Sequence, residues 1–189
     1  ARSCERFRLL SLDISDDKVV LLSSFAGASV DLDPSPSSAI FANASSQPGG
    51  NATTISLMDT SGGFLRGGII GAKLHGFEPW DASISSNGAV SVVGVSSGID
   101  DSLKVMTNGP AIPTIFAKGG EPNLLIHFDS NLDIQWAKVF RSNTFCSFEY
   151  LEADSEFIYI NGYCYDSLIE IENGIERSIA ISQSGVGTR

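Results

Sequence analysis

The sequence repeats itself with a period close to 70 residues, and this repeat limits the possible folds more than any other feature. A shift of 70 residues places Ile55–Arg66 on Leu125–Trp136 without a gap, and Ile14–Leu22 on Ile84–Val92. A shift of 138 residues places Ile14–Leu22 on Glu152–Ile160. Few positions are identical, but the matched segments keep the same order, which indicates tandem units. We assign three units, at residues 1–70, 71–140 and, in shortened form, 141–189.

Each unit consists of short apolar segments separated by turn residues. In the first unit, Phe7–Ile14 and Lys18–Phe25 flank Ser15–Asp17. This pattern predicts a hairpin, because Asp side chains bond to their own backbone and tolerate left-handed conformations. Asp59–Gly63 predicts another turn, and no stretch has a helical period. We therefore predict an all-β fold of tandem four-stranded antiparallel sheets, arranged like the blades of a β-propeller.

Three segments resemble the repeat elements of bacterial-type β-propeller proteins. Ser86–Gly94 resembles D-x-x-G-N-V-Y-V-T-G, Val30–Pro34 resembles V-D-F-D-P, and Phe128–Lys138 resembles L-D-x-x-G-N-x-x-W-A-K. The sequence departs from this pattern at Arg66, where the family has Trp, and at Leu132, where it has the turn Gly. The resemblance implies a propeller-like fold, often in secreted or surface proteins, and no particular activity.

Three units are fewer than the about four to eight blades that close a propeller. Bare sheet faces and strand edges need a cover. We therefore expect the units to belong to a larger propeller, or to be completed by another chain. Other blades or subunits of the same assembly are the expected partners.

Two of the three cysteines are placed symmetrically about an expected turn. Cys146 and Cys164 lie equally far from Ser155, so an antiparallel hairpin centred there places them opposite each other. The Cα spacing of a non-hydrogen-bonded pair overlaps that of a disulfide, so the sequence predicts a Cys146–Cys164 bridge, with two reduced thiols as the alternative. Cys4 is then left over, free or paired with another segment or chain.

Two N-x-S/T sequons begin at Asn43 and Asn51. They lie in the polar stretch Asn43–Thr54, which predicts an exposed loop, so both asparagines are candidate glycosylation sites. This argument does not apply if the source is a bacterium. Together with the predicted disulfide, the sequons favour an extracellular or cell-surface protein.

Charge and hydropathy disfavour several partners. The chain has 12 Lys+Arg against 22 Asp+Glu, a formal net charge of −10. Such a chain repels phosphate backbones, so we expect no binding to nucleic acid. No apolar run approaches the ~20 residues that span a bilayer, so we expect no membrane insertion.

The sequence contains none of the common catalytic motifs. A Ser-His-Asp order, an H-E-x-x-H motif, a C-x-x-C pair and a Gly-rich phosphate loop are all missing. We predict no catalytic, cofactor-binding or metal-binding residue. His127 is interpreted as a solvent-facing strand residue, and His75 as a loop or packing residue.

Acidic clusters are the remaining candidates for chemistry. Asp129–Asp133 spaces its oxygen atoms as calcium loops do, but it lacks the Gly at position six and the distal Glu, so a plain turn is favoured. A second acidic set could gather at one rim of a sheet, although a solvated turn face is favoured. This set consists of Asp13, Asp16, Asp17, Asp31 and Asp33.

The sequence thus predicts a non-enzymatic, secreted or cell-surface propeller-type module. It would act in extracellular assembly, as a filament or appendage component, or in binding a protein or glycan. One alternative is a fragment of a carbohydrate-active propeller hydrolase or lyase that uses Asp or Glu; another is a calcium-dependent adhesin. Acids of different units that converge on one funnel would favour the enzyme. Four aromatic residues are expected to pack between units, with stacking on sugars as the alternative: Trp80, Trp136, Tyr150 and Tyr163.

Overall fold

The chain folds entirely into antiparallel β-structure in the part that the structure describes. The computed structural model describes residues 6–26, 29–33, 41–43, 51–72, 77–96, 101–107, 115–117, 122–142, 145–165, 168–172 and 175–179. All regular elements within these ranges are strands, and all their pairings are antiparallel. The all-β prediction is confirmed.

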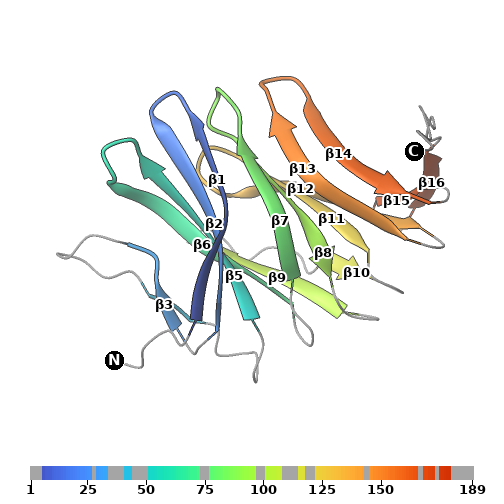
Figure 1. The fold of residues 1–189 in the computed structure, drawn as a ribbon, viewed down its shortest axis with the longest axis horizontal. Coiled ribbons are helices and arrows are strands. Elements are labelled where there is room, and N and C mark those ends of the chain that lie inside the picture. The colour runs from blue at the N-terminus through green and yellow to red at the C-terminus, as the bar shows by residue number, and fades with distance from the viewer. Residues whose placement is uncertain are drawn as a thin grey trace, which may run out of the picture.

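The strands form two large sheets and two small ones (Figure 1). Sheet I has the order β1 (Arg6–Ser15), β2 (Lys18–Ala26), β5 (Asn51–Asp59), β6 (Phe64–Ala72), β9 (Asp101–Thr107), β10 (Ile115–Ala117). Sheet II has the order β7 (Phe77–Ile84), β8 (Val90–Ser96), β11 (Asn123–Phe128), β12 (Ile134–Ser142), β15 (Leu168–Glu172), β16 (Ile175–Ile179). The small sheets are the hairpins β3 (Ser29–Asp31) with β4 (Phe41–Asn43), and β13 (Cys146–Ala153) with β14 (Ile158–Cys164).

The expected groups of four antiparallel strands are present in the first two units, but each sheet extends beyond its unit. β1, β2, β5 and β6 are adjacent in sheet I, and β7, β8, β11 and β12 are adjacent in sheet II. The hairpin β9–β10 of the second unit then pairs with β6, and β15–β16 of the third unit pairs with β12. Each hairpin therefore satisfies the edge N–H and C=O groups of the preceding unit. The strands of the third unit divide between two sheets as a result.

Bulges recur at equivalent positions of the repeat. The first hairpin of each unit shifts register at Leu10, Trp80 and Glu149, respectively. The pairs β5–β6 and β11–β12 shift at Leu65 and Gln135, which the alignment of the first two units places on each other. In the third unit the alignment of the sequences places Phe148, rather than Glu149, on Leu10. The bulge therefore corrects the sequence alignment of the third unit by a single position.

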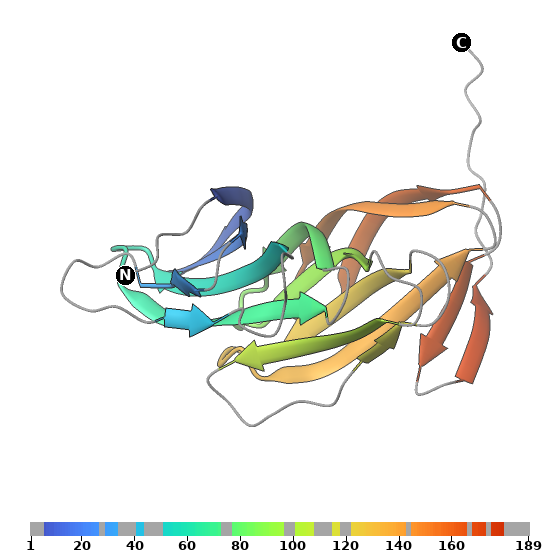
Figure 2. The ribbon, with the colours of Figure 1, turned by 90° about the horizontal axis from the view of Figure 1, so that it is seen from below.

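The main core lies between the facing sides of sheets I and II. Both contribute fully buried apolar side chains, such as Leu22 and Ile55 from sheet I and Ile126 and Phe128 from sheet II. The hairpin β13–β14 covers the other side of sheet II, and Val30 of β3 with Leu32, just after this strand, packs on the other side of sheet I. Sheet I, sheet II and β13–β14 are thus stacked in the order of the three units. The hairpins β3–β4 and β15–β16 lie at opposite ends of the molecule (Figure 2).

Leu132 takes the place of a turn glycine. It has a φ of 59°, and Gly62, at the equivalent position of the first unit, has a φ of 89°. A left-handed conformation costs an L residue about 1–2 kcal/mol. The side chain of Leu132 is fully buried in the main core, and this burial offsets the strain.

We predict that Leu132→Gly lowers the free energy of unfolding by about 1–3 kcal/mol, because the loss of a buried Leu exceeds the strain that is relieved. Urea unfolding measures this change. Gly62→Ala is the matched control, because its Cβ would meet no atom within 4 Å and only the cost of the conformation remains. A Leu132→Gly variant as stable as the parent would contradict the prediction.

Candidate functional site

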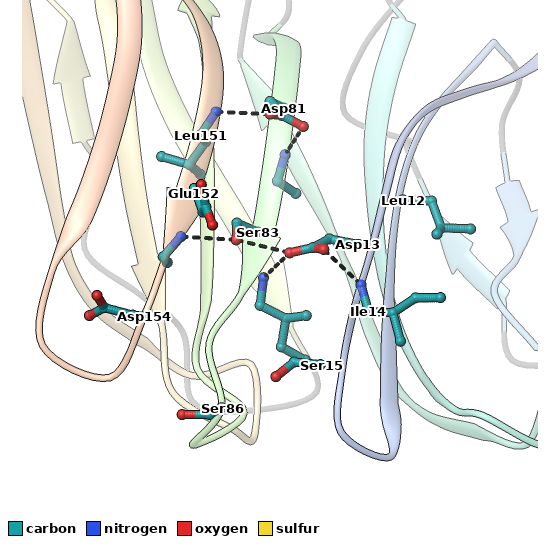
Figure 3. Close-up of a pocket in the computed structure, with 13 residues that line it drawn as sticks. Leu12, Asp13, Ile14, Ser15, Asp81, Ser83, Ser86, Leu151, Glu152 and Asp154 are labelled. Atoms are coloured by element: carbon teal, nitrogen blue, oxygen red, sulfur yellow. Dashed lines mark hydrogen bonds between the residues drawn. The ribbon is translucent and has the colours of Figure 1, made fainter.

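An open groove of about 520 Å³ crosses β1, β7 and β13, near the ends at which these strands turn back (Figure 3). All three units contribute to it. Its polar lining consists of Asp13 and Ser15, then Asp81, Ser83 and Ser86, and finally Glu152 and Asp154.

The three strands that form the groove belong to three different sheets. β7 lies between β1 and β13 and contacts both (Figure 1). Because each is the first strand of its own sheet, its backbone pairs with β2, β8 or β14 rather than with the neighbouring first strand. Side chains must therefore make the polar contacts between them.

Ser11 and Asp13 join β1 to β7. The Ser83 hydroxyl and the Ile84 N–H both donate to Asp13 Oδ2, each at 2.9 Å. The Ser11 hydroxyl donates to Asp81 Oδ1 at 2.6 Å. Two side chains of β1 thus bond to both backbone and side-chain groups of β7.

Asp81 and Ser83 join β7 to β13 from the corresponding positions of the second unit. The Leu151 N–H donates to Asp81 Oδ2 at 2.8 Å, and the Ala153 N–H donates to Ser83 Oγ at 3.0 Å. Ser83 donates to β1 and accepts from β13 at the same time. The two junctions therefore have the same design and share this serine.

Asp13 and Asp81 serve as structural acceptors in this groove. Asp13 Oδ1 accepts the Ile14 N–H at 2.8 Å, and Asp81 Oδ1 also accepts the Ala82 N–H at 2.9 Å. Both oxygens of each carboxylate are thus engaged with strand groups.

The third unit supplies two acids with different surroundings. Asp154 Oδ1 accepts the N–H groups of Glu156 and Phe157 at 2.7 and 2.6 Å, and Tyr159 Oη donates to Oδ2 at 3.2 Å. The hydrogen bonds from these two N–H groups, that of Glu156 first, hold the pKa of Asp154 below its ordinary value. Glu152 is exposed at the groove.

The five aspartates for which a shared rim was the alternative to a solvated turn face do not come together. Asp13 alone lines the groove. Asp16 and Asp17 form the exposed turn between β1 and β2, where Asp16 has a φ of 50°. Asp31 Oδ1 accepts the Asp33 N–H at 3.1 Å, at the end of β3.

Asp129–Asp133 forms a turn closed by its own backbone. Asp129 Oδ1 accepts the N–H groups of Asn131 and Asp133 at 2.8 and 3.0 Å. Asp59 makes the corresponding bonds to residues 61 and 63. These are the bonds of an Asx turn, the interpretation preferred to a calcium loop. Among the described residues, no group of three or more His, Cys, Asp or Glu is placed to hold a metal ion.

His127 is half-buried, so its assignment as a solvent-facing residue was wrong. Its ring stacks on Trp136 with 4.9 Å between centroids, and Nδ1 lies 3.0 Å from the Ser91 hydroxyl. Burial lowers the pKa of His127, and the charge of Asp129 opposes this shift in part. His75 lies outside the described residues.

Cys146 and Cys164 form a disulfide, as predicted, with their Cα atoms 4.1 Å apart. The next pair along the hairpin is hydrogen-bonded, because the Tyr165 N–H donates to the Phe145 carbonyl at 3.0 Å. The cysteines therefore occupy a non-hydrogen-bonded position, where antiparallel strands approach most closely.

The bulge at Glu149 brings the cysteines into register. If the register found between the turn and Tyr150 continued along the hairpin without a bulge, Cys146 would lie opposite Tyr165. The bulge shifts it by a single position, so that Cys146 faces Cys164. Gly162 sits at this shift, where an added Cβ would collide with the Ser147 carbonyl.

The prediction of an exposed loop over Asn43–Thr54 is wrong at its C-terminal end. β5 begins at Asn51, which pairs with Ala26, and Thr53 and Thr54 are buried. The side chains of Asn43 and Asn51 lie outside the described part of the chain, as does Cys4.

Of the four aromatic residues that were expected to pack between units, three are exposed instead. Trp80, Tyr150 and Tyr163 are exposed, whereas Trp136 is half-buried against the cluster that β13–β14 forms with sheet II. Tyr163 instead lies in a surface cluster with Phe145 and Tyr165.

A search of known protein families, of curated proteins and of solved structures gives no match to this chain. Within the described ranges, there is no helix that could cross a membrane.

We predict that Asp81→Asn lowers the free energy of unfolding by about 1.5–3 kcal/mol, because the amide removes charge-assisted bonds between β7 and its two neighbours. Chemical denaturation measures the loss. Glu152→Gln is the control in the same groove, and we expect it to leave stability unchanged. Equal effects of the two substitutions would show that the Asp81 bonds do not join the strands.

His127 should make stability depend on pH. Because its pKa is lowered in the folded state, the unfolded chain takes up the proton first as pH falls below the ordinary value of 6.5. We expect the free energy of unfolding to decrease as pH falls from 7 through this range, and His127→Gln to remove that part of the decrease. A parent and variant with identical pH profiles would contradict this.

Proposed function

We propose that the chain is a non-enzymatic repeat module of the β-propeller type, in which the first strands of successive blades lie side by side. The recurrence of bulges, Asx turns and inter-strand bonds at the repeat spacing supports this proposal. The layered order of the sheets, which follows the order of the units, supports it as well.

The role that we propose is extracellular assembly, as a component of a filament or appendage. The single observation that carries it is the repeated junction between first strands. Ser11 and Asp13 bond to β7 as Asp81 and Ser83 bond to β13. The same type of contact thus connects unit one to unit two and unit two to unit three. An assembly of like units requires such a repeatable contact.

The main alternative is a carbohydrate-active enzyme, which convergence of acids from different units would favour. The groove does gather Asp13, Asp81, Glu152 and Asp154. Three of these carboxylates, however, already accept bonds from strand or turn N–H groups. This engagement favours the structural interpretation. Binding of a glycan or peptide in the groove remains a second candidate role, favoured by the exposed Glu152, which lines the same groove as Ser15 and Ser86.

The proposed location is the cell exterior. The disulfide between Cys146 and Cys164 supports an oxidising compartment. The sequons at Asn43 and Asn51 would add glycans in a secretory pathway. The net charge of −10 supports the expectation that nucleic acid is not a partner.

Glycan turnover assays separate the module from the enzyme. We expect no release of product from a panel of α- and β-linked polysaccharides, and we expect Asp13→Asn to lower the melting temperature. Turnover that Asp13→Asn abolishes while the melting temperature stays unchanged would establish the enzyme instead.

The location is tested on protein secreted by a eukaryotic host. We expect its intact mass to fall after glycosidase treatment, and to correspond to one disulfide. The double substitution of Cys146 and Cys164 by Ser should lower the free energy of unfolding by about 3 kcal/mol, because the bridge joins residues 18 positions apart. A mass that matches the bare, fully reduced chain would contradict the proposed location.

A further inference from the structure

Each unit has two faces, which differ in what covers them. We call the face toward the preceding unit in the chain the leading face, and the opposite one the trailing face. In both internal junctions, the trailing face of one unit packs on the leading face of the next, with sheet I on sheet II and sheet II on β13–β14.

The leading face of the first unit is apolar, and it is exposed where β1 forms it; Val30 and Leu32 cover another part of it, at Phe25 and Ile69. Leu12 and Ile14 of β1 are 51% and 58% exposed, and Leu9 is exposed on the same face. The corresponding residues of the second unit are Ala82 and Ile84, both buried against sheet I. Leu12 and Ile14 therefore occupy positions that are covered wherever a preceding unit is present.

The trailing face of the third unit is also exposed, and it is aromatic. Tyr159 is 55% exposed, and Tyr150 and Tyr163 are exposed beside it on β13–β14. Tyr159 pairs with Glu152 across the hairpin. The equivalent pairs are Val20 with Asp13 in the first unit and Ser91 with Ser83 in the second. Val20 and Ser91 are both fully buried by the unit that follows.

We propose that a second copy of this chain joins these two faces, so that the trailing face of β13–β14 in one copy packs on the leading face of β1 in the other. This inference rests on the proposed assembly role. The contact would continue the stack of units across the boundary between molecules.

The internal junctions are the reason to favour a second copy over an unrelated partner. They show the same pair of faces in contact twice within one molecule, and β1, β7 and β13 form much of both contacts. The third unit needs only its first two strands, β13 and β14, to present this surface.

Glu152 would complete the polar part of the new junction. Asp13 and Ser83 stand at the same position in the first two units, and they accept the N–H groups of Ile84 and Ala153. The corresponding donor at the start of the stack is the N–H of Ile14, which within the chain donates to Asp13 Oδ1 of its own strand. At the internal junction the Ala82 N–H is shared in this way, between Asp81 Oδ1 of its own strand and Ser11 Oγ of the preceding unit. Glu152 is exposed in the groove, so its carboxylate is positioned to accept this N–H from the second copy.

The contact is heterologous, because the two faces differ, and this allows a sharp test. Ile14→Lys charges the leading face and Tyr159→Lys charges the trailing face. Both sites are exposed, so both variants should fold. Leu65→Lys is the matched control, because Leu65 is exposed and its counterpart Gln135 stays exposed although its unit is covered on both faces. All proteins carry Cys4→Ser, which prevents disulfide exchange through that thiol.

Sedimentation velocity over a range of concentrations should show self-association of the parent and of Leu65→Lys. Ile14→Lys and Tyr159→Lys should each raise the dissociation constant by about tenfold or more. An equimolar mixture of these two variants should recover association, but only as a dimer, because one intact face of each kind remains.

Association that both variants retain would overturn the head-to-tail contact and leave the proposed assembly role in place. Loss of association in one variant only would also overturn it, because that result indicates a face that binds to itself. A parent chain that stays monomeric at every concentration would count against both the contact and the assembly role.

Discussion

The hydrogen bonds that Ser11, Asp13, Asp81 and Ser83 make join the first strands of the three units, beside the apolar core that packs their sheets together. The first strands of the three units lie side by side but belong to different sheets, so backbone pairing does not link them. Short side chains with strong acceptor atoms replace it and bond to N–H groups of the next strand. Charged acceptors make these bonds stronger than neutral ones. The groove lies along these bonded strands.

Edge sharing adds a second link between units. The hairpins β9–β10 and β15–β16 leave their own units and extend the sheets of the units before them. This exchange covers strand edges that would otherwise pair with other chains. It also makes each unit depend on its successor, so that local unfolding of one unit exposes an edge of another.

The groove shows how residues that suggest catalysis can have a structural role. Acids of three units line one surface, which is the pattern expected of a propeller hydrolase. Asp13, Asp81 and Asp154 also accept backbone N–H groups, and these bonds support the structural role that we propose for them. The calcium-loop pattern at Asp129 has the same explanation, since its carboxylate closes its own turn.

The sequence by itself determined the repeat, the all-β class and the local turns, because Asp residues and alternating apolar segments act over a few neighbouring positions. It also indicated the Cys146–Cys164 pair, although the assumed symmetric turn left out the bulge at Glu149 that aligns them. Only the tertiary structure decided where β9–β10 and β15–β16 pair, that His127 is half-buried, and which aspartates meet in the groove. These features depend on free edges and on neighbours in other units, far away along the chain, and a local pattern carries no information about such partners.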